Sequence, residues 1–209
     1  MHAALRVSIG QHSDKGRKPT QQDFHGARVP LEPLAALKGI CVALADGISS
    51  SEVSGEASEA AVVGFLEDYY CTSEAWSVQT SVERVASAMS SWLHAQTLSS
   101  PFRYDRERGY VCTFSALVLK ASLAHVFHVG DTRVYRVCPD GLEQLTHDHS
   151  VRRSAEEKLL SRALGASAQL ELDYRAVEID KGSTFVLASD GVYEHVSEAR
   201  VAQLIAEHA

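Results

Sequence analysis

Acidic residues stand where apolar strands are expected to end. Asp46-Gly47 follows the run Ile40–Ala45, Asp190-Gly191 follows 184–189, and Gly130-Asp131 follows 123–129. A carboxylate at the mouth of a buried strand is fixed in position, and a neighbouring glycine lets the backbone carbonyl approach a hard cation. Three such aspartates suggest a magnesium or manganese site built from oxygen ligands.

A simpler alternative is that these aspartates only cap helices or form turns, roles that suit a short acceptor side chain. The segment Pro139-Asp140-Gly141 is an ordinary turn of that kind. Taken singly, each of the other three fits the same explanation. Their recurrence at strand ends, together with the segment 16–23, favours a shared site. The segment His147-Asp148-His149 is interpreted as a loop-ordering element and not as a set of metal ligands.

The pattern of apolar residues predicts helices and strands in two separate groups. Residues spaced by three or four positions predict helices over 55–70, 78–98 and 197–208, and a helical turn or two over 159–164. Short β-branched and aromatic runs predict strands over 40–45, 110–120, 123–129, 133–137, 142–145, 170–179 and 184–188. We expect the four strands from 110 to 145 to form a meander and the last two a hairpin around 180–183. This order favours a layered α+β fold over a doubly wound parallel sheet.

Length and composition favour one folded domain over residues 1–209. The chain is 45% hydrophobic and 22% charged, with a formal net charge of −7. The acidic excess disfavours nucleic acid as a partner. The four cysteines form no CxxC motif, and no apolar run in the sequence is long enough for a signal peptide or a membrane span. We therefore expect a cytoplasmic protein with no membrane segment in this chain.

Seven segments, in order, resemble the metal-dependent serine/threonine protein phosphatases of type 2C, the PPM family. Any one of them is weak evidence, but their common order along most of the chain is specific. The segments are GRKPTQQD from Gly16, ALADGISSSEVSGEASEAAV from Ala43, CTFSALVL from Cys112, HVGDTRVYRV from His128, LTHDHS from Leu145, LSRALG from Leu160 and LASDGVYEHVS from Leu187.

The resemblance implies a fold and a set of metal ligands. The fold is a four-layer αββα sandwich of two antiparallel sheets flanked by helices, with the metals at one end of the sheets. Asp46 matches the aspartate that bridges two Mn²⁺ or Mg²⁺ ions, and the Gly47 carbonyl completes one of them. Asp190 matches a second ligand, Asp131 a ligand of a third ion, and Asp23 a supporting acid. Either Lys18 or Arg17 occupies the region of the residue that grips the substrate phosphate.

The implied activity is hydrolysis of phosphoserine and phosphothreonine in proteins by a metal-bridged hydroxide, with Asp46 and Asp190 as the catalytic pair. Its partners would be phosphorylated proteins and an opposing serine/threonine kinase. Two nearby divalent ions acidify water, so no side-chain nucleophile is needed. The sequence accordingly has no GxSxG elbow and no P-loop. The alternative is an inactive or weakly active pseudophosphatase that binds phosphoproteins and regulates other proteins.

Four segments depart from the family pattern. Ile48–Glu52 replaces a glycine-rich stretch, and Gln22 replaces a glutamate, which lowers the negative charge around the predicted metals. Only ten residues, Val151–Leu160, stand where relatives carry a longer flap over the substrate. The chain ends at Ala209, before the family's final strand and its further aspartate. We therefore expect the sequence to be part of a longer protein and one cluster ligand to be missing from it.

Overall fold

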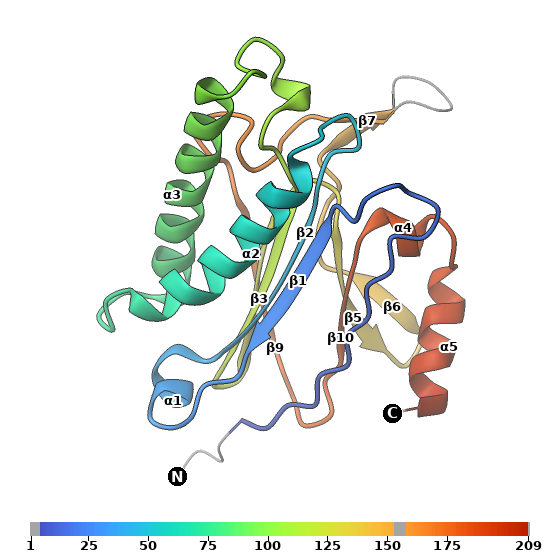
Figure 1. Ribbon diagram of the computed structural model, residues 1–209. Coiled ribbons are helices and arrows are strands. Elements are labelled where there is room, and N and C mark those ends of the chain that lie inside the picture. The colour runs from blue at the N-terminus through green and yellow to red at the C-terminus, as the bar shows by residue number, and fades with distance from the viewer. Residues whose placement is uncertain (1–4, 153–157, 209) are drawn as a thin grey trace.

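The computed structural model describes residues 5–152 and 158–208 and contains two antiparallel sheets with helices on both outer faces (Figure 1). The strands are β1 (Asp23–Arg28), β2 (Ile40–Asp46), β3 (Phe114–Lys120), β4 (Leu123–Val129), β5 (Arg133–Cys138), β6 (Gly141–Gln144), β7 (Ser150–Arg152), β8 (Lys158–Leu160), β9 (Asp173–Glu178) and β10 (Phe185–Ala188). The helices are α1 (Leu34–Lys38), α2 (Ser54–Cys71), α3 (Val78–Ser99), α4 (Asp190–Tyr193), α5 (Glu198–His208) and a short 3₁₀ turn over Arg106–Arg108.

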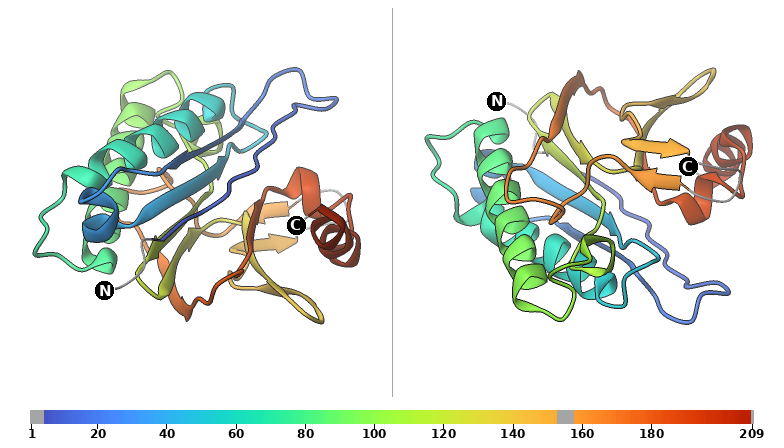
Figure 2. Two further views of the ribbon diagram at one scale, coloured as in Figure 1. Left: turned by 90° about the horizontal axis from the view of Figure 1, so that it is seen from below. Right: turned by 90° about the horizontal axis from the view of Figure 1, so that it is seen from above.

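The sheets and helices form four layers. The first sheet has the strand order β1-β2-β3-β4-β9 and the second the order β10-β5-β6, while β7 and β8 pair separately. Figure 2 shows α2 and α3 outside the first sheet and α5 outside the second. The α+β sandwich expected from the sequence is confirmed. Within the described ranges, no helix combines the length and apolar character needed to cross a bilayer.

Two apolar cores hold these layers together. The larger core lies between α2, α3 and one face of the first sheet, and it includes Phe65, Tyr69, Phe114 and Phe127, all at most 1% exposed. The smaller core lies between the two sheets and includes Leu117, Val126 and Val134. Alternate residues of β3 and β4 face the two cores, because successive side chains of a strand point to opposite faces. Both faces of the central strands are therefore buried.

Two predictions about strand pairing are wrong. The chain crosses from the first sheet to the second between β4 and β5, so the four strands from 110 to 145 form two hairpins and not one meander. The predicted hairpin around 180–183 is likewise a crossing from the first sheet to the second: β9 pairs with β4, and β10 pairs with β5. Turn residues signal a change of direction, but they do not specify which sheet receives the next strand.

Local structure also differs from the prediction at several places. Residues 158–160 form strand β8 and not a helical turn, because a short leucine-rich run is compatible with either structure. Strand β3 starts at Phe114 instead of Tyr110, since Cys112 bridges Gly47 on one side and Leu164 on the other. Strand β1 and helix α1 were not predicted. Residues 153–157, within the predicted short flap, lie outside the described residues.

We predict that Gly165→Ala destabilises the protein by about 2–4 kcal/mol in urea denaturation. Gly165 has φ +82°, and an added Cβ would overlap the Tyr110 carbonyl oxygen and lie 2.9 Å from the Cβ of Leu93. Gly64→Ala on α2 is the matched control, because its Cβ would meet only the Met89 sulfur at 3.6 Å. That variant should gain about 0.5–1 kcal/mol from helix propensity. Equal effects of the two variants would contradict the explanation.

Candidate active site at the end of the sandwich

Asp46 and Asp23 lie directly opposite each other where β2 ends and β1 begins. Residues paired in register share a face of the sheet, and here that face points toward the second sheet. Asp46 is only 6% exposed. Its backbone is fixed by Thr113: the Asp46 N–H donates to Thr113 Oγ1 at 2.9 Å, and the Thr113 N–H donates to the Asp46 carbonyl at 2.8 Å.

Asp190 is brought to the same end of the molecule by the second sheet. It is the first residue of α4, and only Ser189 separates it from the end of β10. The preceding residue, Ser189, donates its hydroxyl to Asp23 Oδ2 at 2.8 Å. This bond joins segments that are 166 residues apart in the sequence. It therefore ties the end of β10 in one sheet to the start of β1 in the other.

The electrostatics of Asp46 show which charges surround it. Burial is the main cause that raises the pKa of Asp46 well above its usual range, followed by a hydrogen bond with Asp23 and the charges of Asp23 and Asp190. The ammonium group of Lys18 acts in the opposite direction and lowers this pKa. Three predicted carboxylates and one predicted phosphate-binding cation are thus near enough to influence one group. Arg17 lies on the same exposed loop as Lys18.

Asp131 occupies the loop between β4 and β5, where the chain passes from one sheet to the other, and is 7% exposed. His149 holds the residue before it from both sides. The His149 N–H donates to the Gly130 carbonyl at 2.6 Å, and the Gly130 N–H donates to His149 Nδ1 at 3.1 Å. His149 also contacts Asp173 at 2.9 Å. The prediction that segment 147–149 orders a loop agrees with these contacts.

Tyr193 connects the Asp131 loop to the helix that begins at Asp190. Its hydroxyl donates to the Asp131 carbonyl at 2.9 Å. Burial, together with the charges of Asp131, Asp148 and Asp190, raises the pKa of this hydroxyl. The guanidinium of Arg133 lies 3.8 Å from the centre of the Tyr193 ring and pairs with Asp148 at 2.8 Å. These supporting contacts were not predicted, although Arg133 and Tyr193 lie within the matching segments from His128 and Leu187.

The side chain of Gln22 supports the loop that follows Gly47. Its side-chain Nε2 donates to the Ser51 carbonyl and the Ser54 hydroxyl, both at 2.8 Å, and to the Ile48 carbonyl at 3.3 Å. A glutamate could donate none of these bonds when ionised. The amide therefore has a structural role here that the sequence did not reveal, beyond the loss of one negative charge.

The donor groups at this end are of the kind that Mg²⁺ and Mn²⁺ prefer. They are the carboxylates of Asp46, Asp23 and Asp190 and the backbone carbonyl of Gly47, all hard oxygen donors. A divalent cation would offset both the burial and the neighbouring negative charges that oppose ionisation of Asp46. In the part of the chain that the structure describes, no three acidic, histidine or cysteine side chains form a ready-made metal site. Any cation here would therefore take further ligands from backbone and water.

We predict that Gln22→Glu destabilises the metal-free protein by about 1–3 kcal/mol at neutral pH, because a buried carboxylate would face two carbonyl oxygens and lose its donors. The measurement is urea denaturation. Gln21→Glu is the matched control: Gln21 is exposed and bonds only to the Ser13 hydroxyl among the described residues, so its replacement should cost less than about 0.5 kcal/mol. A Gln22→Glu variant as stable as this control would show that the amide does not hold the loop.

Comparison with known proteins places the chain in a family. The family model for protein phosphatase 2C matches residues 12–209. The chain is 28% identical to the serine/threonine phosphatase Stp of Listeria innocua, over 98% of this chain and 83% of that protein. It is 22% identical to the protein phosphatase PhpP of Streptococcus pneumoniae, over 78% of this chain and 72% of that protein.

Solved structures share the fold. The serine/threonine phosphatase of S. agalactiae superposes with a TM-score of 0.77 at 20% identity, over 99% of this chain and 86% of that one. The Mycobacterium tuberculosis phosphatase PstP superposes with a TM-score of 0.70 at 20% identity, over 89% and 79%. The family match covers nearly the whole chain, and the site lies where the matching segments meet. The chain therefore belongs to the protein phosphatase 2C family.

Proposed function

We propose that this chain hydrolyses phosphoserine and phosphothreonine in proteins, using two or three Mn²⁺ or Mg²⁺ ions. The observation that carries the proposal is the convergence of Asp23, Asp46 and Asp190 from three distant segments, with Lys18 close enough to affect the same group. Within this proposal, Asp46 and the Gly47 carbonyl hold the first pair of ions together with Asp190. Asp23 supports them, and Asp131 holds a further ion.

When bound, such ions supply an acidified water as nucleophile and offset charge on the phosphoryl oxygens. The residues of the chain position the substrate and the ligands. Lys18 is suited to bind the non-bridging oxygens of the phosphate, because its ammonium group is close enough to Asp46 to lower the pKa of that carboxyl. A turn closed by the bond from the Lys18 N–H to the Lys15 carbonyl, 3.1 Å long, holds this loop. Arg17 remains a second candidate for the same role.

The proposal includes phosphorylated proteins as substrates, an opposing serine/threonine kinase, and the cytoplasm as the place of action. The names of the Listeria and Streptococcus relatives support phosphatase activity toward serine and threonine. All four cysteines fall within the described residues, and each is free, including the buried Cys41 and Cys112. Unpaired cysteines are usual in reducing compartments.

Asp46→Asn should make the metal-free protein more stable at pH 7, by about 1 kcal/mol or more. In the unfolded chain this carboxyl ionises near pH 4, whereas in the folded protein its pKa is raised. Wild type therefore loses stability as pH rises from about 4 toward the folded pKa, and asparagine removes that loss. Thermal melting should show a gain of about 2–4 °C, or more, that is absent below pH 4.

Added Mn²⁺ should raise the melting temperature of wild type by about 5 °C or more at saturating concentration, since a ligand that binds only the folded state stabilises it. The Asp46→Asn variant should lack most of this shift. Asp140→Asn, in the exposed turn between β5 and β6, is the control and should respond like wild type. An undiminished Mn²⁺ shift in Asp46→Asn would exclude this residue as a ligand.

Hydrolysis of para-nitrophenyl phosphate and of phosphoserine peptides with Mn²⁺ tests the activity itself. Asp46→Asn and Asp190→Asn should each lower kcat by about 10²-fold or more, whereas Asp140→Asn should not. Lys18→Ala should raise KM more than Arg17→Ala does. If wild type binds Mn²⁺ but hydrolyses neither substrate, the chain is instead a phosphoprotein-binding pseudophosphatase. If both aspartate variants keep full activity, the site assignment is wrong.

A further inference from the structure

The loop after α3, residues 100–109, lies against the turn that follows the predicted metal ligands Asp46 and Gly47. This rim loop is bonded to the turn that leads from Asp46 and Gly47 into α2 (Figure 1). Ser50 donates its hydroxyl to the Glu107 carbonyl at 2.7 Å, and Ser51 donates to the Gly109 carbonyl at 2.8 Å. Ser51 is five residues after Asp46, a span of at most about 18 Å. An extended peptide whose phosphoresidue sits at the carboxylates would reach this loop.

The rim loop presents preorganised aromatic and cationic side chains to solvent. Tyr104 is 89% exposed, and the Arg103 guanidinium lies 4.9 Å from the centre of its ring. The Arg108 guanidinium lies 5.3 Å from the Phe102 ring and pairs with Glu52 at 3.2 Å. Tyrosine and arginine, together with tryptophan, are enriched among the residues that carry most of the binding energy at protein interfaces. Because these side chains are already stacked, they would lose less conformational entropy when a ligand binds.

The two loops beside the predicted metal ligands carry a net positive charge, although the whole chain is acidic. The chain carries −7, yet the rim loop and the phosphate-binding loop, residues 13–20, contain six basic residues against three acidic ones. The basic residues are Lys15, Arg17, Lys18, Arg103, Arg106 and Arg108, and the acidic ones are Asp14, Asp105 and Glu107. An acidic ligand would therefore be attracted locally, even though the protein as a whole repels it.

We infer that the rim loop is a docking surface for the substrate polypeptide and that it selects phosphoproteins with acidic residues flanking the phosphoresidue. Arg103 contacts the flanking carboxylates, and Tyr104 packs against the peptide chain beside them. Arg108 is already paired with Glu52 and serves chiefly to hold the loop. This inference rests on the proposed phosphatase function, but it concerns residues outside the group proposed to hold metal and phosphate.

Two phosphoserine peptides test this surface, one with three glutamates on each side of the phosphoserine and one with three glutamines. Wild type should show a kcat/KM about fivefold higher for the acidic peptide at low salt, and the preference should shrink at high salt. The double variant Arg103→Glu/Tyr104→Ala should reduce the ratio to about one. Its hydrolysis of para-nitrophenyl phosphate should remain at the wild-type rate, because that substrate does not reach the rim loop.

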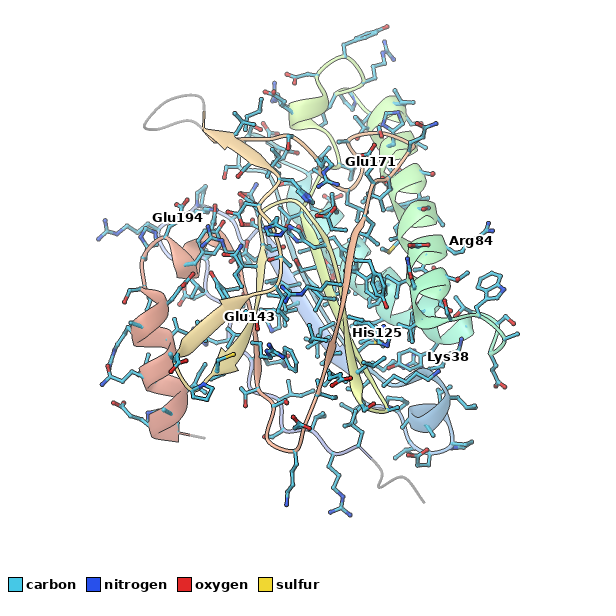
Figure 3. All side chains as sticks on the ribbon, turned by 180° about the vertical axis from the view of Figure 1, so that it is seen from behind. Lys38, Arg84, His125, Glu143, Glu171 and Glu194 are labelled. Atoms are coloured by element: carbon cyan, nitrogen blue, oxygen red, sulfur yellow. The ribbon has the colours of Figure 1, made fainter. Side chains whose placement is uncertain are left out.

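Arg84→Glu is the matched control. Arg84 also lies over an aromatic ring, that of Trp76 at 5.9 Å, but it sits fifteen residues before the end of α3 (Figure 3). That separation corresponds to about 22 Å of helix. This variant makes the same change in net charge as Arg103→Glu, so it should keep the preference of wild type. An equal loss in both variants would mean that overall charge, and not the rim loop, sets the preference.

Binding measurements separate this inference from the proposed activity. If wild type hydrolyses none of the substrates, the proposed function fails, and fluorescence anisotropy with the same two peptides still tests the surface. Wild type and Asp46→Asn should then bind the glutamate-flanked peptide about fivefold more tightly than the glutamine-flanked peptide. The double variant Arg103→Glu/Tyr104→Ala should bind the two peptides equally. No preference in wild type, or a preference that survives the double variant, would overturn the inference.

Discussion

The burial of Asp46 beside two further carboxylates is the constraint on which the rest of this structure depends. Asp46 lies 6% exposed beside Asp23 and within the influence of Asp190, an arrangement that opposes ionisation. Like charges stay together in a protein only when the surrounding structure fixes them or a cation offsets them. The backbone supplies the first of these conditions, since Asp46 is paired to β1 and to Thr113 by main-chain and hydroxyl contacts.

Contacts between the two sheets complete that fixation. Ser189, which follows the last strand of the second sheet, donates to Asp23 at the start of β1 in the first sheet. Tyr193, in the helix α4 that comes next, donates to the carbonyl of Asp131 in the loop that leaves the first sheet after β4. Each is a single bond, but both lie at the same end of the sandwich. The two apolar cores position the sheets, and these polar contacts set the local orientation of the acids.

Polar side chains replace backbone flexibility beside the site. The loop after Gly47 has serines where the family resemblance leads one to expect glycines, and two of these serines, Ser50 and Ser51, are hydrogen-bonded. Ser50 and Ser51 donate to the rim loop, while the Ser51 carbonyl and the Ser54 hydroxyl accept from Gln22. The two departures from the family pattern thus belong to one hydrogen-bonded unit. A fixed loop also gives the rim loop a constant position relative to the carboxylates.

The sequence by itself determined the helices at 55–70 and 78–98, most of the strands, the layered α+β class and the family. Those features follow from local periodicity and from short motifs, which depend on neighbouring residues. Tertiary structure alone decided that β4 and β5 part into different sheets, that 158–160 is a strand, and that Gln22 holds a loop. Strand partners and buried hydrogen bonds join residues tens of positions apart, so no local pattern encodes them.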